Sequence, residues 1–178
     1  MKRSFMMFCI GLIGFGFSSC DEDNLASVLP DFDVNLSESQ EIPVTIDKTD
    51  GEWAEFSSTE NISIINKDTE DHLNKIKSVT LTKLNYTVIN FNGDEMGEVE
   101  GAFSADNGVA MQNKFVVKTA AQNGTVYEVD ATELNRIGKA LKAGNTVMVR
   151  YSGKALCDNA SMNFVIKVSY EAKIKVSP

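Results

Sequence analysis

The chain has 178 residues and a formal net charge of −8, and once a removable leader of about 20 residues is set aside, one domain with one hydrophobic core remains. Lys2 and Arg3 lie in that leader, so the remainder carries 15 basic against 25 acidic residues. Nucleic-acid backbones and anionic headgroups repel such a surface, which excludes nucleic acid as a partner and requires any membrane contact to come from something other than charge.

Residues 1–19 are typical of a secretory signal peptide. Lys2 and Arg3 form its positive start, and residues 5–17 form an uncharged run of 13 residues, too short to span a bilayer permanently. The run ends in Phe-Ser-Ser-Cys at 17–20, with small residues before the cysteine, where a signal peptidase needs room. This tetrapeptide resembles a lipobox, and the resemblance implies cleavage before Cys20 and acylation of its thiol. Two or more acyl chains would anchor the protein stably in a membrane.

The residues after the cysteine indicate where in the envelope the protein lies. Asp-Glu-Asp-Asn at 21–24 resembles the acidic stretch that follows the lipidated cysteine in surface lipoproteins of the Bacteroidota, which implies the outer membrane and the cell surface. The alternative is the inner-membrane retention signal of proteobacterial lipoproteins, which Asp21 also resembles. Residues 20–30 then form the lipidated cysteine and a linker, whose ten free residues average about 17 Å and reach at most about 35 Å.

From residue 31 the dominant period of hydrophobicity is two, which predicts strands with one buried face. Residues 32–36 and 42–46 alternate in this way around a polar stretch at 37–40, which predicts a hairpin. Two further strands are expected at 53–57 and 62–65.

The clearest alternation lies at the C-terminal end of the chain. Residues 147–155 and 164–176 both alternate, and a short polar loop at 157–160 connects them. This predicts an antiparallel hairpin with long arms.

The middle of the chain predicts one long strand and three shorter ones. In residues 79–91 the apolar phase shifts near Thr82 and Lys83, which predicts a bulge. The shorter strands are expected at 99–105, 109–118 and 126–129, with a turn at 106–108.

Two short helices are also predicted. The first spans 130–143, with Asp130 as its N-cap beside Glu133 and with Gly144 as its C-cap. The second spans 68–77. Because most connections join neighbouring antiparallel strands, residues 31–178 are predicted to form a single, mainly β domain, an antiparallel β-sandwich that is Ig-like or related, with two short helices.

No residue stands out as catalytic. His72 is the single histidine and is expected to be a solvated helix residue, while Cys157 lies beside Asp158, whose charge would raise the pKa of the thiol. One histidine and one free cysteine in the mature chain cannot form a structural zinc site. Glu98 and Glu100 are better explained as residues on the solvent-exposed face of a strand than as the paired carboxylates of a glycosidase. The sequence therefore predicts no enzyme, with a hydrolase built from distant acids as an alternative.

Two features remain as ligand candidates. Carboxylates at 47–52, 94–100 and 106–107 could supply oxygen ligands for calcium, but none of these segments has the ligand spacing of an EF-hand loop. Asp and Asn are also common in turns for reasons of backbone conformation. No cofactor is therefore expected, and structural calcium is the alternative. Trp53, near Phe56, is expected in the core, with a stacking platform for a sugar ring as the alternative.

The sequence thus predicts a non-catalytic cell-envelope lipoprotein that acts as a binding or accessory module, held to the membrane through Cys20. It resembles the small Bacteroidota lipoproteins of unknown function. The alternative is a glycan-binding module serving polysaccharide uptake, with Trp53 and one exposed tyrosine in the contact. The choice between a protein and a glycan partner is left open.

Overall fold

The computed structural model describes residues 30–178, so the predicted signal peptide, Cys20 and nearly all of the predicted linker lie outside the described residues. Residues 31–178 form one compact unit. None of the helices that are described is long and apolar enough to cross a membrane.

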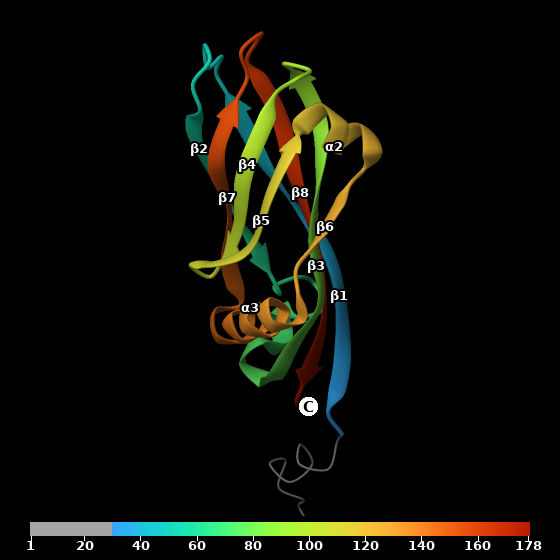
Figure 1. The fold of residues 1–178 in the computed structure, drawn as a ribbon. Coiled ribbons are helices and arrows are strands. Elements are labelled where there is room, and N and C mark those ends of the chain that lie inside the picture. The colour runs from blue at the N-terminus through green and yellow to red at the C-terminus, as the bar shows by residue number, and fades with distance from the viewer. Residues whose placement is uncertain (1–29) are drawn as a thin grey trace, which may run out of the picture. The chain divides into compact units, whose positions relative to one another are not determined.

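Within this range the chain forms two four-stranded antiparallel sheets packed face to face (Figure 1), which confirms the predicted β-sandwich. We call the sheet with strand order β1-β8-β3-β6 the long sheet and the sheet with order β2-β7-β4-β5 the short sheet. The strands of the long sheet are β1 (Phe32–Ile46), β8 (Met162–Val176), β3 (Ile76–Gly93) and β6 (Val126–Glu128). Those of the short sheet are β2 (Ala54–Ser63), β7 (Thr146–Leu156), β4 (Glu98–Ala105) and β5 (Gly108–Val116).

The first predicted hairpin is wrong, because residues 32–46 form one strand. β1 pairs with β8 along its whole length, from Phe32 opposite Val176 to Ile46 opposite Met162. β1 is an edge strand, so polar residues in its middle need no turn to reach water. The chain also runs without a break from Ala54 to Ser63, where two separate strands were expected.

The C-terminal hairpin prediction is wrong as well. β7 pairs with β2 and β4 in the short sheet, whereas β8 pairs with β1 and β3 in the long sheet. The loop at 157–161 therefore crosses from one sheet to the other. Period-two alternation fixes which face of a strand is buried, but it does not say which strand lies beside it.

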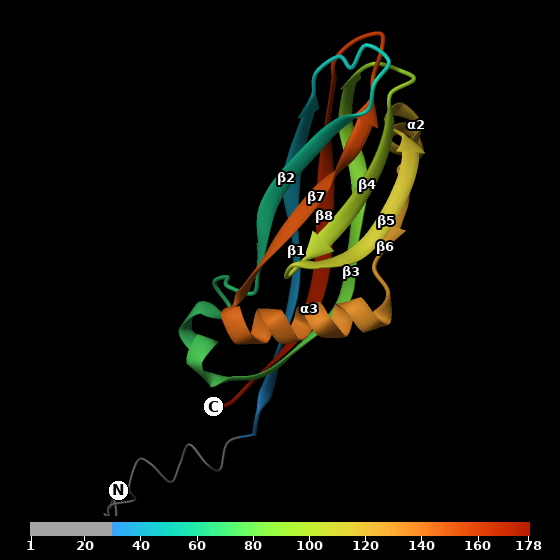
Figure 2. The same cartoon turned by 60° about the vertical axis from the view of Figure 1, so that its left-hand side comes forward.

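The bulge in β3 is confirmed, since the register with β8 shifts between Leu81 and Lys83. The helix at 130–143 is confirmed as α3 (Ala131–Gly144), in which the Asp130 carboxylate accepts hydrogen bonds from the backbone N–H groups of residues 132 and 133. Its C-cap is Asn145, at a φ of 60°, rather than the expected Gly144. α3 lies across one end of the sandwich (Figure 2), where its buried Ile137 and Leu141 share the core with the longer strands.

The other helices differ from expectation. Residues 68–77 were expected to be helical, but only a 3-10 turn, η1 (Glu70–Lys75), forms before β3 begins at Ile76. A third helix, α2 (Val117–Asn123), was missed, because its start was assigned to the strand expected at 109–118. Gly124, at a φ of 58°, ends α2, so the Asn-Gly pair that signals a turn is here a helix end.

Tyr170 and Tyr151 are both buried but differ in hydrogen bonding. The Tyr170 hydroxyl joins the two sheets, because it donates to the Ser63 carbonyl (2.9 Å) and accepts from the Ser63 N–H (3.1 Å). The Tyr151 hydroxyl has no hydrogen-bond partner within residues 30–178. We expect Tyr170→Phe to lower the free energy of unfolding by about 1–3 kcal/mol, and Tyr151→Phe to leave it unchanged or raise it. Urea denaturation of both variants checks this, and an equal loss in both would contradict the assigned bridge.

Alkaline pH is expected to destabilise the fold through its four tyrosines. Burial raises the pKa of Tyr86 to about 12 and also raises the pKa of Tyr127, Tyr151 and Tyr170. Because the folded chain disfavours the phenolates, this stabilisation is complete below the unfolded pKa of about 10 and is lost as the pH rises above it. A spectrophotometric titration should show phenolate absorbance appearing together with unfolding. A tyrosine that ionises near pH 10 in the intact fold would contradict this.

Candidate functional site

A hollow of about 610 Å³ lies on the outer face of the short sheet. β2, β7, β4 and β5 all contribute to it, so its shape depends on how these four strands pair. Its lining residues are Glu55, Glu100, Gly101, Ala102, Gln112, Asn113, Lys114, Ser152, Gly153 and Lys154.

A row of alternating charge crosses the hollow, one residue from each strand. The register places Glu55 beside Lys154, Lys154 beside Glu100, and Glu100 beside Lys114. The Lys114 ammonium lies 2.9 Å from Glu100 and 3.3 Å from Glu98, and the Lys154 ammonium lies 3.3 Å from Glu100. Hydrogen bonds from Lys114 and then Lys154 lower the pKa of Glu100, and the same contact with Glu100 raises the pKa of Lys114. Lys114, Lys154 and Glu100 are therefore linked as ion pairs rather than standing as isolated charges.

Trp53 lies beside this charged row. The Lys114 and Lys154 ammonium groups stand 5.1 and 5.4 Å from the centroid of its ring, within the range of a cation–π contact. The side chain is half-buried and is not part of the core. Trp53 therefore does not fill the core position that the sequence favoured, and its use as a ligand platform stays a prediction.

The floor of the hollow is made of small residues. Next to the charged row, the register aligns Ser57, Ser152, Ala102 and Gln112. Gly101 and Gly153 face each other across β4 and β7. The floor is low where Ser152 and Ala102, which point outward, stand beside the longer side chains of the charged row.

Gly101 and Gly153 are also required by packing. A Cβ at Gly101 would stand 2.3 Å from the Tyr151 hydroxyl, beneath the sheet, and a Cβ at Gly153 would stand 2.1 Å from the backbone oxygen of Glu100. These two glycines therefore allow β4, β7 and the core to pack closely beneath the hollow.

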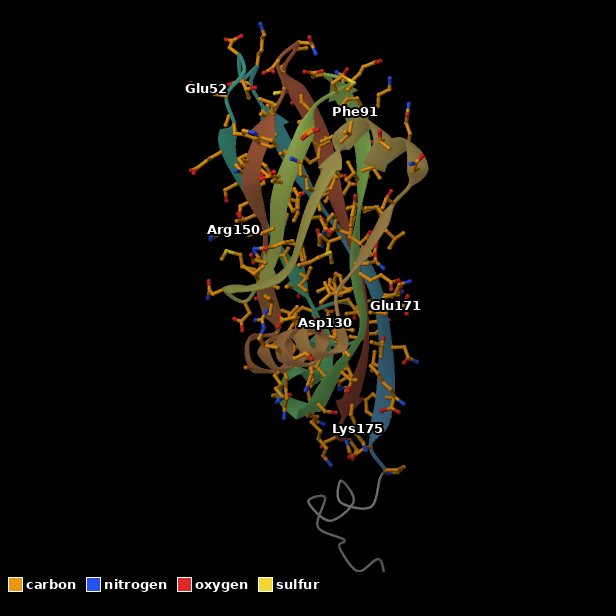
Figure 3. All side chains as sticks on the ribbon, viewed as in Figure 1. Glu52, Phe91, Asp130, Arg150, Glu171 and Lys175 are labelled. Atoms are coloured by element: carbon orange, nitrogen blue, oxygen red, sulfur yellow. The ribbon has the colours of Figure 1, made fainter. Side chains whose placement is uncertain are left out.

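A second hollow, of about 310 Å³, lies on the outer face of the long sheet. Figure 3 shows Arg150 of the short sheet and Glu171 of the long sheet projecting from opposite sides of the sandwich. The residues that line this second hollow are Ser37, Glu38, Ser39, Lys83, Lys167, Ser169, Tyr170 and Glu171. Tyr170, the aromatic residue among them, is buried, so this face is a poorer candidate and a useful control surface.

The loops at the Trp53 end of the sandwich are joined by hydrogen bonds. Asp94, which is 4% exposed, accepts from the Asn159 N–H (2.9 Å) and side-chain amide (3.1 Å) and from the Met96 N–H (3.0 Å). The Asn159 N–H is the main cause of the lowered pKa of Asp94. Asp158 accepts from the Gly51 N–H (2.7 Å) and the Thr49 hydroxyl (3.0 Å). These contacts hold the β1–β2, β3–β4 and β7–β8 loops against one another.

The other sequence candidates are not gathered at the hollow. His72 lies in η1, where its ring meets Phe32 edge-on with centroids 5.3 Å apart. Cys157 is buried, its thiol donates to the Asp47 carbonyl (3.2 Å), and burial is the main cause of its raised pKa. The side chains of His72 and Cys157 therefore make packing contacts and do not line the hollow.

Two of the calcium segments, 47–52 and 94–100, meet at the Trp53 end of the sandwich through the β7–β8 loop. Within residues 30–178 no group of three or more His, Cys, Asp or Glu side chains is placed to hold a metal ion. Glu98 and Glu100, considered as a glycosidase pair, both contact Lys114. Lys114, Lys154 and Gln112 were missed, because only the pairing of distant strands makes them neighbours.

Comparisons with known proteins do not assign this chain to a family. No protein-family model and no curated protein matches it. Among solved structures, a chain of Desmodium yellow mottle tymovirus is similar over 100% of this chain and 97% of its own length, with 13% sequence identity and a TM-score of 0.40. A likeness at that level carries no conclusion about this protein.

Proposed function

We propose that the protein is a non-catalytic binding module of the cell envelope, anchored by a lipid on Cys20, whose ligand occupies the hollow on the outer face of the short sheet. One observation carries the binding role: a row of paired charges crosses a hollow with small residues in its floor, and the single tryptophan of the chain contacts two lysines of that row. The volume of the hollow lies in the range of ligand sites, and Trp53 beside it adds an aromatic surface to its placed polar groups.

The electrostatics of the carboxylates support binding over hydrolysis. A general acid needs a pKa raised toward neutrality. Hydrogen bonds from Lys77, Asn159 and Lys114 instead lower the pKa of Asp31, Asp94 and Glu100, respectively. These three groups stay ionised at neutral pH, which suits acceptors of hydrogen bonds.

The course of β1 supports display of the hollow away from a membrane. β1 runs for 15 residues from Phe32 to Ile46, a rise of about 50 Å, and Trp53 follows the far end of the strand. A tether through residues 20–30 would join the sandwich at the Phe32 end, opposite the Trp53 end.

The anchor is tested by comparing two cysteine variants in whole cells. We expect Cys20→Ala to lose fatty-acid label and membrane association, because its thiol is the acyl acceptor, while Cys157→Ala keeps both. Protease treatment of intact cells should degrade the wild-type domain if it lies on the surface. An acylated Cys20→Ala product, or an unlabelled wild type with its leader still attached, would overturn the proposal.

The binding face is tested by photo-crosslinking in intact cells, with a photoreactive residue placed at Gln112 in the hollow or at Ser169 on the opposite sheet. We expect a defined product from Gln112 only, and its loss when Ala102→Phe fills the hollow. Products that arise equally from both faces, or that survive Ala102→Phe, would refute this assignment.

A further inference from the structure

We propose that the hollow binds an uncharged carbohydrate chain that lies across β2, β7, β4 and β5. This inference rests on the proposed function, in that it names the ligand class of the same hollow.

The charge pairing favours a neutral ligand. The carboxylates of Glu98 and Glu100 contact the ammonium groups of Lys114 and Lys154, so that each of these two lysines has a carboxylate within 3.3 Å. Glu55 adds a third carboxylate opposite Lys154 in the register. The net charge of these five side chains is therefore slightly negative, and the net charge of the whole chain, −8, is negative as well. An anionic ligand would meet repulsion here, and it would have to displace carboxylates from both lysines.

The alternation of donors and acceptors fits hydroxyl groups. An ammonium group only donates hydrogen bonds and a carboxylate only accepts them, whereas a hydroxyl does both. Along the row Glu55, Lys154, Glu100 and Lys114, each neighbouring pair presents one acceptor and one donor. Adjacent hydroxyls of a sugar ring can satisfy such a pair without adding charge, and hydrogen bonds to ionised groups are the stronger ones.

Trp53 supplies an apolar surface at a fixed place. The C–H face of a sugar ring packs on an aromatic ring, and on Trp53 it would take the place of the Lys114 or Lys154 ammonium group, which lie over the ring at 5.1 and 5.4 Å from its centroid. An aromatic ring that is already positioned loses little conformational freedom when a ligand arrives.

The dimensions fit an extended chain rather than a compact ligand. Four neighbouring strands place the ends of the charged row roughly 14 Å apart. The row next to it, with Ser152 and Ala102 at its centre, is low enough for rings to approach the sheet. The hollow therefore suits an oligosaccharide.

Calorimetric titration of the acylated protein in detergent tests this inference. The probes are neutral oligosaccharides (xylo-, manno-, malto- and cello-hexaose) and an anionic one of equal length, hexagalacturonate. We expect one of the neutral probes to bind, with little dependence on salt, and hexagalacturonate to bind at least tenfold more weakly. Trp53→Ala should lower the affinity for the neutral ligand at least tenfold, Ala102→Phe should abolish binding, and Ser169→Phe should leave the affinity unchanged.

The outcomes separate this inference from the proposed function. If hexagalacturonate binds better, if no neutral probe binds, or if Trp53→Ala and Ala102→Phe both bind normally, the carbohydrate inference is wrong. If the Gln112 crosslink is still lost in Ala102→Phe, the hollow remains the binding face and its ligand belongs to another class. If the crosslink also survives, both proposals fail.

Discussion

Gly153→Ala is expected to lower the free energy of unfolding by about 3 kcal/mol, one of the two largest losses that we expect from a single substitution. The added Cβ would stand 2.1 Å from the Glu100 carbonyl oxygen, which belongs to the backbone of the neighbouring strand. That oxygen cannot retreat without disturbing the pairing of β4 with β7. The change also alters the floor of the hollow, so ligand binding should fall with stability. Chemical denaturation measures the loss.

Gly144→Ala is the matched control for this prediction. Nothing lies within 4 Å of a Cβ at Gly144, which is the last residue of α3. Alanine there should raise the free energy of unfolding by about 0.5–1 kcal/mol, because glycine is the poorer helix former. If Gly153→Ala proved as stable as Gly144→Ala, β4 and β7 would not approach one another as closely as described.

Asp94→Ala is expected to lower the free energy of unfolding by about 2–4 kcal/mol at neutral pH. The change removes the acceptor for three donor groups, the N–H and side-chain amide of Asn159 and the N–H of Met96, and leaves these donors in a largely buried place. Thermal or denaturant unfolding should also report a looser contact between the β3–β4 and β7–β8 loops. Asp33→Ala, which removes an exposed ion pair with Lys173, should change stability by no more than about 0.5 kcal/mol.

The pH dependence of the Asp94 effect follows from the sign of its pKa shift. Hydrogen bonds lower the pKa of Asp94 below the ordinary 3.8, so its ionised form stabilises the fold at and above neutral pH. That contribution is lost as the pH falls through the lowered pKa. The stability gap between wild type and Asp94→Asn should therefore narrow steadily below about pH 4. A gap that stayed constant down to unfolding would show that the carboxylate charge is not what holds Asn159.

Local signals in the sequence were sufficient for some elements of the fold. The phase shift near Thr82 located the bulge, and Asp130 located the start of α3. Each of these depends on residues close together in the chain. The pairing of strands does not depend on residues close together in the chain. For this reason the loop after Leu156 was assigned to a hairpin, although it joins the two sheets.

The candidate site shows the same limit. Trp53 was singled out because it is the lone tryptophan, but its surroundings were not predicted. Lys114 and Lys154 are forty residues apart and meet Glu100 only because β5 and β7 flank β4. No spacing within the chain records that register. The polar residues of each strand could be assigned to a wet face, but the hollow that they form together could not.

Fluorescence of Trp53 tests most directly whether the hollow is the binding face. The chain has one tryptophan, so its emission reports on this place without background from another. On titration with soluble glycan fractions of the native envelope, the wild type and Ser169→Phe should show the same saturable change, and Ala102→Phe should show none. A ligand that bound Ala102→Phe and wild type equally, with the emission of Trp53 unchanged, would contradict the account.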